Sequence, residues 1–296
     1  MKTILPIFLI FTLLLGACSV QTTNSTSFEE DNRLKISVSI ASIQWLVDKI
    51  GGELVQTQSL TTSGDDPHTY EPSPSQMTAM AASDLYFTVG VEFEEVWIPK
   101  FVEANSDLQV VDISVGVQRI PLADHDHEDD DSHEGLDPHI WLSPGNMELI
   151  ANNISSILGS TDPKNAEVYQ NNLENVLVIL ESVDNQLNQM FSQTLRKQFL
   201  IIHPSLGYIA NAYGLQMIPV EVDGQEPSPT QLAEILHASE EYGIDTLFTQ
   251  TGSNPLNVQV LAEQADIDQI IEIDPMAYDW SANMLFIGNA LQKALN

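Results

Sequence analysis

The pattern of apolar and polar positions predicts strands and helices that alternate along the chain. Strands are expected where short apolar runs lie between turn-forming residues, at residues 35–40, 53–60, 85–89, 110–113, 117–120, 198–202, 216–220, 246–248 and 269–273. Helices are expected where apolar residues recur every three or four positions, at residues 43–50, 75–82, 92–104, 147–158, 206–213, 230–242, 257–264 and 280–295. This alternation indicates βα units around mainly parallel sheets, which bind ligands beyond the carboxyl ends of their strands.

One helical segment is much longer than the others. Its apolar residues continue at steps of three and four from Tyr169 to Leu195, without glycine or proline between Lys164 and Lys197. Such a helix spans about 50 Å at about 1.5 Å per residue. Because βα units lie on both sides of it, we expect two α/β lobes, residues 34–160 and 198–296, joined by one rigid helix at residues 161–197. A long helix within a single domain and a coiled coil are the alternatives.

The first residues are typical of a signal peptide. Lys2 precedes an apolar run at residues 4–15, which is too short to span a bilayer as a mature helix. The run ends in L-G-A-C, which resembles the lipidation box of bacterial lipoproteins, and Cys18 is the only cysteine of the chain. We therefore expect residues 1–18 to be removed or modified with Cys18 as lipidation site, residues 19–33 to form a polar tether, and the protein to be extracytoplasmic and lipid-anchored, in the periplasm or on the outer cell surface. An ordinary secretory signal with a chance cysteine is the alternative.

The charge of the chain excludes some partners and favours others. With 42 acidic and 10 basic residues, the net charge is −32. Nucleic-acid binding needs clustered Lys and Arg, so it is not expected, and adsorption to anionic membranes is disfavoured. An acidic surface attracts cations. The run D-H-D-H-E-D-D-D-S-H-E at residues 124–134 predicts a solvated loop that gathers divalent cations weakly, although a plain acidic loop has the same composition.

Three histidines share one sequence context. His68, His139 and His203 each adjoin a proline, which restricts the local backbone, and each lies at a loop or strand end. They are too far apart in sequence for a local metal motif, so only the fold can bring them together. Neutral imidazole suits Zn²⁺, and also Mn²⁺, Fe²⁺ and Cu²⁺. Three histidines with one carboxylate or water fit tetrahedral zinc.

The fourth ligand and the supporting carboxylates are less determined. Asp279, in the last strand-to-helix loop, is a candidate ligand from the second lobe, but it is equally suited to cap the helix that starts at Trp280. Each ligating histidine needs an acceptor for its other ring N–H. The candidates near the motifs are Asp65, Asp66, Glu71 and Glu226, and the sequence does not choose among them. His237, within a helical pattern, is interpreted as a surface or packing residue.

The order of these motifs resembles the zinc/manganese substrate-binding lipoproteins of bacterial ABC importers, the ZnuA-like proteins. The matching stretches are G-D-D-P-H-T-Y-E-P-S-P, the His-rich acidic loop, D-P-H-I-W-L-S-P, H-P-S-L-G-Y-I-A-N-A-Y-G-L, E-V-D-G-Q-E-P-S-P and D-P-M-A-Y-D-W. The resemblance covers residues 34–296 and implies metal held between the two lobes by His68, His139 and His203, with Asp279 as fourth ligand. A histidine at position 203 favours zinc, because members that resemble manganese carriers tend to have a carboxylate there.

The resemblance implies a monomeric, non-catalytic carrier. It would capture Zn²⁺ and deliver it to an ABC permease and its ATPase. A manganese or broad divalent-metal carrier of the same family is the first alternative. A zinc-dependent hydrolase, with Glu71 or Glu226 as base, and a surface adhesin or metal buffer are further alternatives.

Overall fold

The computed structural model describes residues 32–122, 135–221 and 227–296. Residues 33–296 form one unit, which contains both α/β lobes. The expected signal peptide, the lipidation site Cys18, most of the tether, the acidic loop at residues 124–134 and Glu226 lie outside the described residues.

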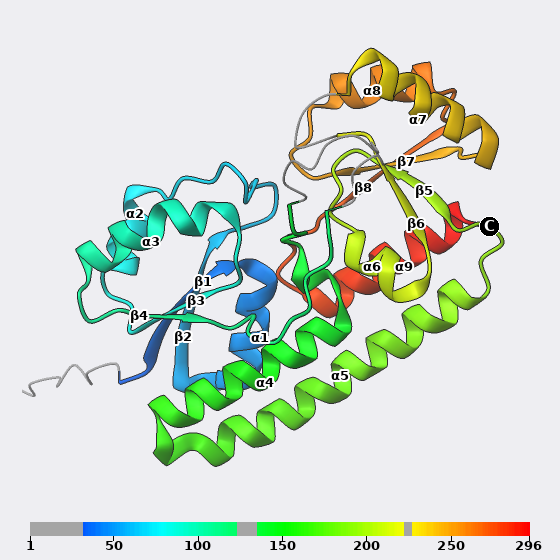
Figure 1. Cartoon of the computed structure of the whole chain (residues 1–296). Coiled ribbons are helices and arrows are strands. Elements are labelled where there is room, and N and C mark those ends of the chain that lie inside the picture. Colours follow the sequence, from blue (N-terminus) through cyan, green and yellow to red (C-terminus); the bar gives the residue numbers. More distant parts are fainter. Residues whose placement is uncertain (1–31, 123–134, 222–226) are drawn as a thin grey trace, which may run out of the picture. The chain divides into compact units, whose positions relative to one another are not determined.

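The first lobe is built on a four-stranded parallel sheet in the order β2-β1-β3-β4 (Figure 1). Its strands are β1 (Leu34–Ile40), β2 (Val55–Thr61), β3 (Leu85–Thr88) and β4 (Gln109–Asp112), and its helices are α1 (Ala41–Gly51), α2 (Pro74–Met80), α3 (Glu92–Ala104) and α4 (Pro144–Thr161). The inner strands β1 and β3 are buried almost throughout, as apolar strands covered on both faces must be.

One strand prediction in this lobe is wrong. Residues 117–120 belong to no strand of the sheet. The chain there instead meets residues 135–137: Pro121 and Leu136 form an isolated antiparallel bridge, and the Asp137 N–H donates to the Ile120 carbonyl over 2.9 Å. The apolar side chains of this stretch predicted a strand, but the backbone of Ile120 bonds Asp137, in the segment that carries His139, and the hydroxyl of Tyr208.

The second lobe repeats this arrangement. Its parallel sheet has the order β6-β5-β7-β8. The strands at its edges are the second and the fourth of the lobe, as in the first lobe. The strands are β5 (Gln198–Ile201), β6 (Gln216–Pro219), β7 (Thr246–Gln250) and β8 (Gln269–Ile273), and the helices are α6 (Gly207–Tyr213), α7 (Pro229–Tyr242), α8 (Pro255–Gln264) and α9 (Trp280–Ala294). The prediction of two α/β lobes with parallel sheets is confirmed.

Helix α5 (Ala166–Ser192) connects the lobes. It packs against α1 and α4 of the first lobe and against α6 and α9 of the second, with α4 beside it (Figure 1). Its buried side chains form one stripe at helical spacing, namely Tyr169, Leu173, Val176, Leu180, Val183, Leu187 and Phe191. The helix ends at Ser192, earlier than expected, where the Lys197 ammonium and the Thr194 hydroxyl both bond the Phe191 carbonyl (2.8 and 3.0 Å).

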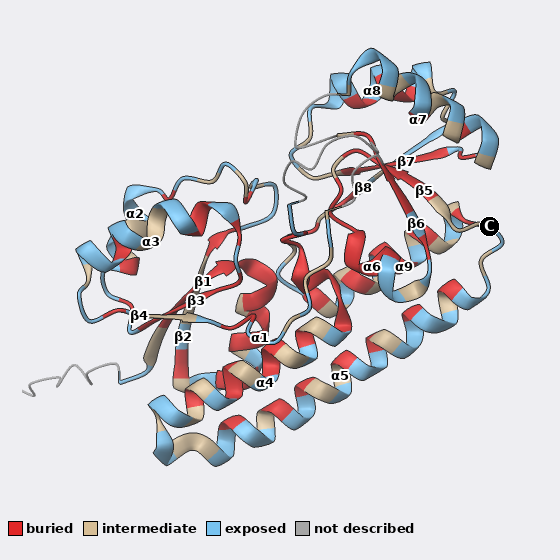
Figure 2. Ribbon diagram, viewed as in Figure 1, coloured by how far each residue is buried: buried red, intermediate tan, exposed pale blue. Residues whose placement is uncertain are grey.

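Two tryptophans join the lobes behind the loops that carry the histidines. The Trp141 indole N–H donates to the Pro275 carbonyl over 2.8 Å, and the Trp280 indole N–H donates to the Trp141 carbonyl over 2.7 Å. Both side chains are buried and belong to the same core cluster. Figure 2 shows that buried residues follow the strands and the inner faces of the helices. The segment after His139 is therefore fixed to the segment between β8 and α9. Within the described part of the chain, no helix has the length and apolar character needed to cross a bilayer.

Candidate metal centre

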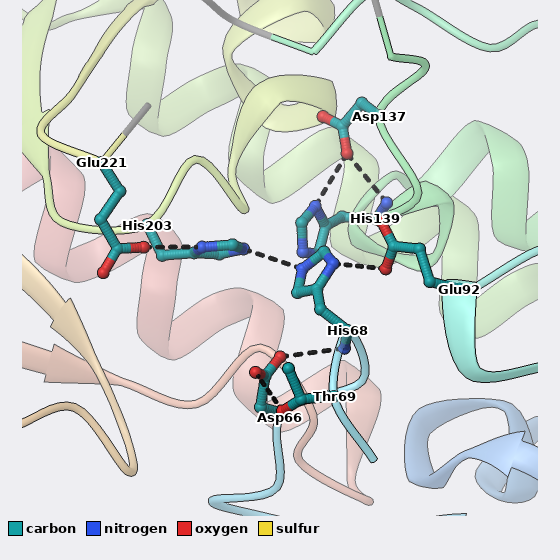
Figure 3. Close-up of polar contacts among 8 residues, drawn as sticks. All are labelled: Asp66, His68, Thr69, Glu92, Asp137, His139, His203 and Glu221. Carbon is teal, nitrogen blue, oxygen red and sulfur yellow. Dashed lines mark hydrogen bonds and ion pairs between the residues drawn. The ribbon is translucent and has the colours of Figure 1, made fainter. Parts of the chain in front are cut away.

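The fold brings the three predicted histidines together. His68 lies in the loop after β2, His139 precedes a 3₁₀ turn at Ile140–Leu142, and His203 follows β5 by two residues. One ring nitrogen of each lies within 4.8 Å of the others. Among the described residues, these three side chains form the cluster that could hold a metal ion. The rings converge edge to face, with centroids 5.0–5.6 Å apart (Figure 3).

The nitrogen spacing suits a tetrahedral ion. The His68 Nε2 and His203 Nε2 atoms are 3.2 Å apart. Two ligands on a tetrahedral zinc ion at about 2.0–2.1 Å are separated by roughly 3.3–3.4 Å. If each neutral imidazole carries its proton on Nδ1, where it meets a carboxylate, the two Nε2 atoms present lone pairs to each other, and an ion between them would satisfy both.

Each histidine is held from behind by one carboxylate (Figure 3). The His139 Nδ1 pairs with Asp137 Oδ1 at 2.8 Å, and the His203 Nδ1 pairs with Glu221 Oε2 at 3.0 Å. The His68 Nδ1 pairs with Glu92, the first residue of α3. Because each Nδ1 is engaged by a carboxylate, each Nε2 is left to face the centre. This is the usual way in which proteins orient ligating imidazoles.

The acceptors proposed from the sequence are not these carboxylates. Asp66 accepts the backbone N–H of His68 and the Thr69 hydroxyl, so it shapes the loop rather than the ring. Asp65 accepts from Thr62, and Glu71 is exposed. The carboxylates that bond the rings of His203 and His68 lie elsewhere in the sequence. Glu221 comes shortly after β6, and Glu92 is the first residue of the helix after β3. The rule that ligands gather at the carboxyl ends of strands would have included both.

The environments of the histidines differ. His139 is buried, and burial lowers its pKa despite the Asp137 carboxylate. Burial also acts to lower the pKa of His68, but the hydrogen bond and charge of Glu92, with Asp66 and Glu221 nearby, outweigh it and leave the pKa raised. The pKa of Glu92 is lowered in return, chiefly by its hydrogen bond with His68. Of these two histidines, His139 therefore stays neutral to lower pH.

Asp279 is not in the histidine cluster that the described residues form. It is the N-cap of α9, where its carboxylate accepts from the Ala282 N–H at 3.1 Å and from the Ser281 hydroxyl at 3.0 Å. Two other acidic residues, Asp65 and Asp274, line a narrow pocket together with His139 and His203, although neither belongs to that cluster. Sequence reasoning missed Asp274, although it is the first residue after β8 and so occupies a strand end like those of the histidines.

Similar proteins share this fold and most of this chain's length. The manganese-binding lipoprotein MntA of Halalkalibacterium halodurans is 26% identical over 88% of this chain and 85% of its own. The high-affinity zinc uptake system protein ZnuA of Bacillus subtilis is 25% identical over 85% of this chain and 82% of its own. A crystal structure of ZnuA superposes with a TM-score of 0.83 and 32% identity, covering 89% of this chain and 100% of that one.

A family model matches residues 36–294, from the first strand into the last helix. This match includes both lobes, the connecting helix and all three histidines. The chain therefore belongs to the ZnuA family, described as zinc-uptake complex component A, periplasmic.

Proposed function

We propose that the protein captures Zn²⁺ outside the cytoplasm and delivers it to an ABC permease. The observation that carries this is the convergence of three imidazoles from two lobes, each oriented by its own carboxylate. The ion is cargo, so the site must bind tightly and also open. The ligands lie on loops at the strand ends, and the lobes are held by α5 and by the hydrogen bonds of Trp141 and Trp280. Release would therefore come from local movement of these loops rather than from separation of the lobes.

The ligands in this proposal are the Nε2 atoms of His68, His139 and His203. For the fourth position we propose Asp274 in place of Asp279, because it lines the pocket beside two of the histidines and directly follows β8 of the second lobe. Asp65 also lines this pocket, but its carboxylate accepts from the N–H and hydroxyl of Thr62. Its Oδ1 accepts the Met276 N–H at 2.9 Å, which holds the carboxylate in place. A set of three imidazoles and one carboxylate favours zinc and still admits harder ions such as Mn²⁺.

Outside the described residues, we propose that the acidic loop at residues 124–134 concentrates cations near the site and that Cys18 carries a lipid anchor. Residues 34–160 and 198–296 would then act as the two lobes and residues 161–197 as their link. The partners of this monomeric carrier would be a membrane permease and its ATPase. The name of one relative supports these partners and the lipid anchor: it is the manganese ABC transporter substrate-binding lipoprotein PsaA of Streptococcus pneumoniae.

A hydrolase needs a carboxylate free to act as general base. The three carboxylates that touch the cluster, Glu92, Asp137 and Glu221, each bond a histidine Nδ1. In this proposal they orient the ligands, and this supports binding over turnover.

The test is a calorimetric titration of residues 19–296 with Zn²⁺ and then Mn²⁺, each with a competing chelator. One tight zinc site and feeble manganese binding are expected, and His139→Ala should abolish the tight site. His237→Ala is the matched control, since His237 is exposed on α7. Equal tight binding of both ions would make the protein a broader divalent-metal carrier, and the absence of a tight site would end the proposal. Asp274→Asn and Asp279→Asn, compared in the same assay, separate the two candidate fourth ligands.

A further inference from the structure

Helix α6 of the second lobe lies directly against the carboxylate that orients His139. Gly207, the first residue of α6, is buried, and a Cβ atom placed on it would lie 2.3 Å from Asp137 Oδ2. Real Cβ atoms essentially never come within 3.0 Å of a neighbour. Any residue other than glycine at position 207 would therefore have to displace the Asp137 side chain.

Asp137 has no room to yield without disturbing His139. It is fully buried, and its Oδ1 accepts both the ring Nδ1–H and the backbone N–H of His139, each at 2.8 Å. Its Oδ2 is buried without a hydrogen-bond partner among the described residues. A buried carboxylate oxygen normally finds a donor. Packing against α6, rather than a hydrogen bond of its own, therefore sets where this oxygen lies.

The next residue of α6 holds the backbone of the same aspartate. The Tyr208 hydroxyl donates to the Asp137 carbonyl over 3.0 Å and accepts the Ile120 N–H over 3.4 Å. Tyr208 is itself buried. Asp137 is thus fixed through its side chain by Gly207 and through its main chain by Tyr208.

We propose that Gly207 and Tyr208 are positioning residues through which the second lobe sets the orientation of His139, a ligand supplied by the first lobe. This rests on the proposed function, since it concerns the same metal centre. The same short segment, residues 203–208, also carries His203. A shift of this segment would withdraw His203 and release Asp137 together, so two of the three ligands loosen in one movement.

The test is a double-mutant cycle of Gly207→Ala and Asp137→Ala, with Zn²⁺ affinity measured by chelator competition. Gly207→Ala should weaken binding by about 10- to 100-fold, as losses of ligand-orienting groups do. The double variant should bind no more weakly than Asp137→Ala alone, because removing the carboxylate removes the overlap and leaves the new Cβ 3.6 Å from Ile120 Cδ1, an ordinary contact. The absorption spectrum of the Co²⁺-loaded protein should change in Gly207→Ala, since it reports ligand geometry.

Gly288→Ala is the matched control. A Cβ on Gly288 of α9 would lie 2.3 Å from Leu187 Cδ2, an equal overlap against the connecting helix instead of the metal centre. It should lower the melting temperature and leave zinc affinity and the Co²⁺ spectrum unchanged.

Additive losses in the cycle, or wild-type affinity in Gly207→Ala, would overturn the inference. If Gly207→Ala does not fold, Tyr208→Phe is the deciding variant. It keeps the ring, removes the hydroxyl that bonds the Asp137 carbonyl, and should weaken zinc binding by about 2- to 10-fold. Wild-type affinity and a wild-type Co²⁺ spectrum in this variant would refute the proposal. Failure of the wild-type protein to bind zinc tightly would instead refute the proposed function.

Discussion

The three carboxylates behind the histidines should differ in importance according to their burial. Asp137 is fully buried, whereas the side chains of Glu221 and Glu92 are 30% and 58% exposed. Removing Asp137 leaves two buried N–H donors of His139 without an acceptor, which costs about 1–3 kcal/mol for each such group. Water can replace an exposed carboxylate, and exposed pairs contribute about 0.2–1 kcal/mol.

Burial therefore predicts an order of zinc affinities. The cost of an unpaired donor is borne by the metal-free protein as well as by the zinc-bound protein, so only part of it appears as lost affinity. Asp137→Ala should weaken binding by about 10- to 100-fold. Glu92→Ala should weaken it by only about 1.5- to 5-fold, since about 1.4 kcal/mol corresponds to a factor of ten. Glu221→Ala should fall between them. The measurement is a chelator-competition titration at constant pH and at two salt concentrations.

Glu95→Ala is the control for Glu92→Ala, because it removes the same charge from the same exposed first turn of α3. The small effect of Glu92→Ala should shrink at high salt, where exposed charges are screened, and that of Asp137→Ala should persist. If Glu92→Ala costs as much as Asp137→Ala, burial does not govern the support of these ligands and the reasoning fails.

Three further outcomes are expected. Zinc affinity should fall as the pH drops through the pKa of His68, which lies above 6.5, because a protonated imidazole cannot ligate; removing Glu92 should move this fall to lower pH, and an unmoved profile would contradict the pairing. Trp280→Phe should lower the free energy of unfolding by about 2–4 kcal/mol, since it leaves the buried Trp141 carbonyl unpaired and removes part of a buried ring; chemical denaturation measures this, and an unchanged midpoint would refute it. Deleting residues 124–134 should reduce the number of weakly bound ions and leave the tight site's affinity similar, as judged by calorimetry; a collapse of tight binding would mean that the loop supplies a ligand.

Local pattern was sufficient for most elements of the fold. Helix α3 begins and ends where the periodicity predicted, at Glu92 and Ala104, and β8 likewise, at Gln269 and Ile273. Such elements are determined by side chains close to one another along the chain. The strand prediction for residues 117–120 is wrong because their apolar side chains suit a strand, whereas the Ile120 carbonyl accepts from Asp137, a residue distant in sequence that no local pattern reveals.

The candidate site divides in the same way. His68, His139 and His203 were identifiable from the sequence because each carries its own local context, a proline at a strand end or loop. Asp279 stays a prediction for the opposite reason: a carboxylate before a helix suits capping as well as ligation. The structure places Asp279 at the α9 cap and Asp274 among the residues that line the pocket.

The sequence by itself determined the two α/β lobes, the long connecting helix and the three imidazoles, since these depend on periodicity and on residue types within a few positions. Only the tertiary structure decided which carboxylate holds each ring and why position 207 must be glycine. Glu92 is 24 residues from His68, and Gly207 is 70 residues from the Asp137 it contacts. Contacts over such separations are set by how the strands are ordered and how the lobes pack, and these are properties of the folded chain rather than of any segment of it.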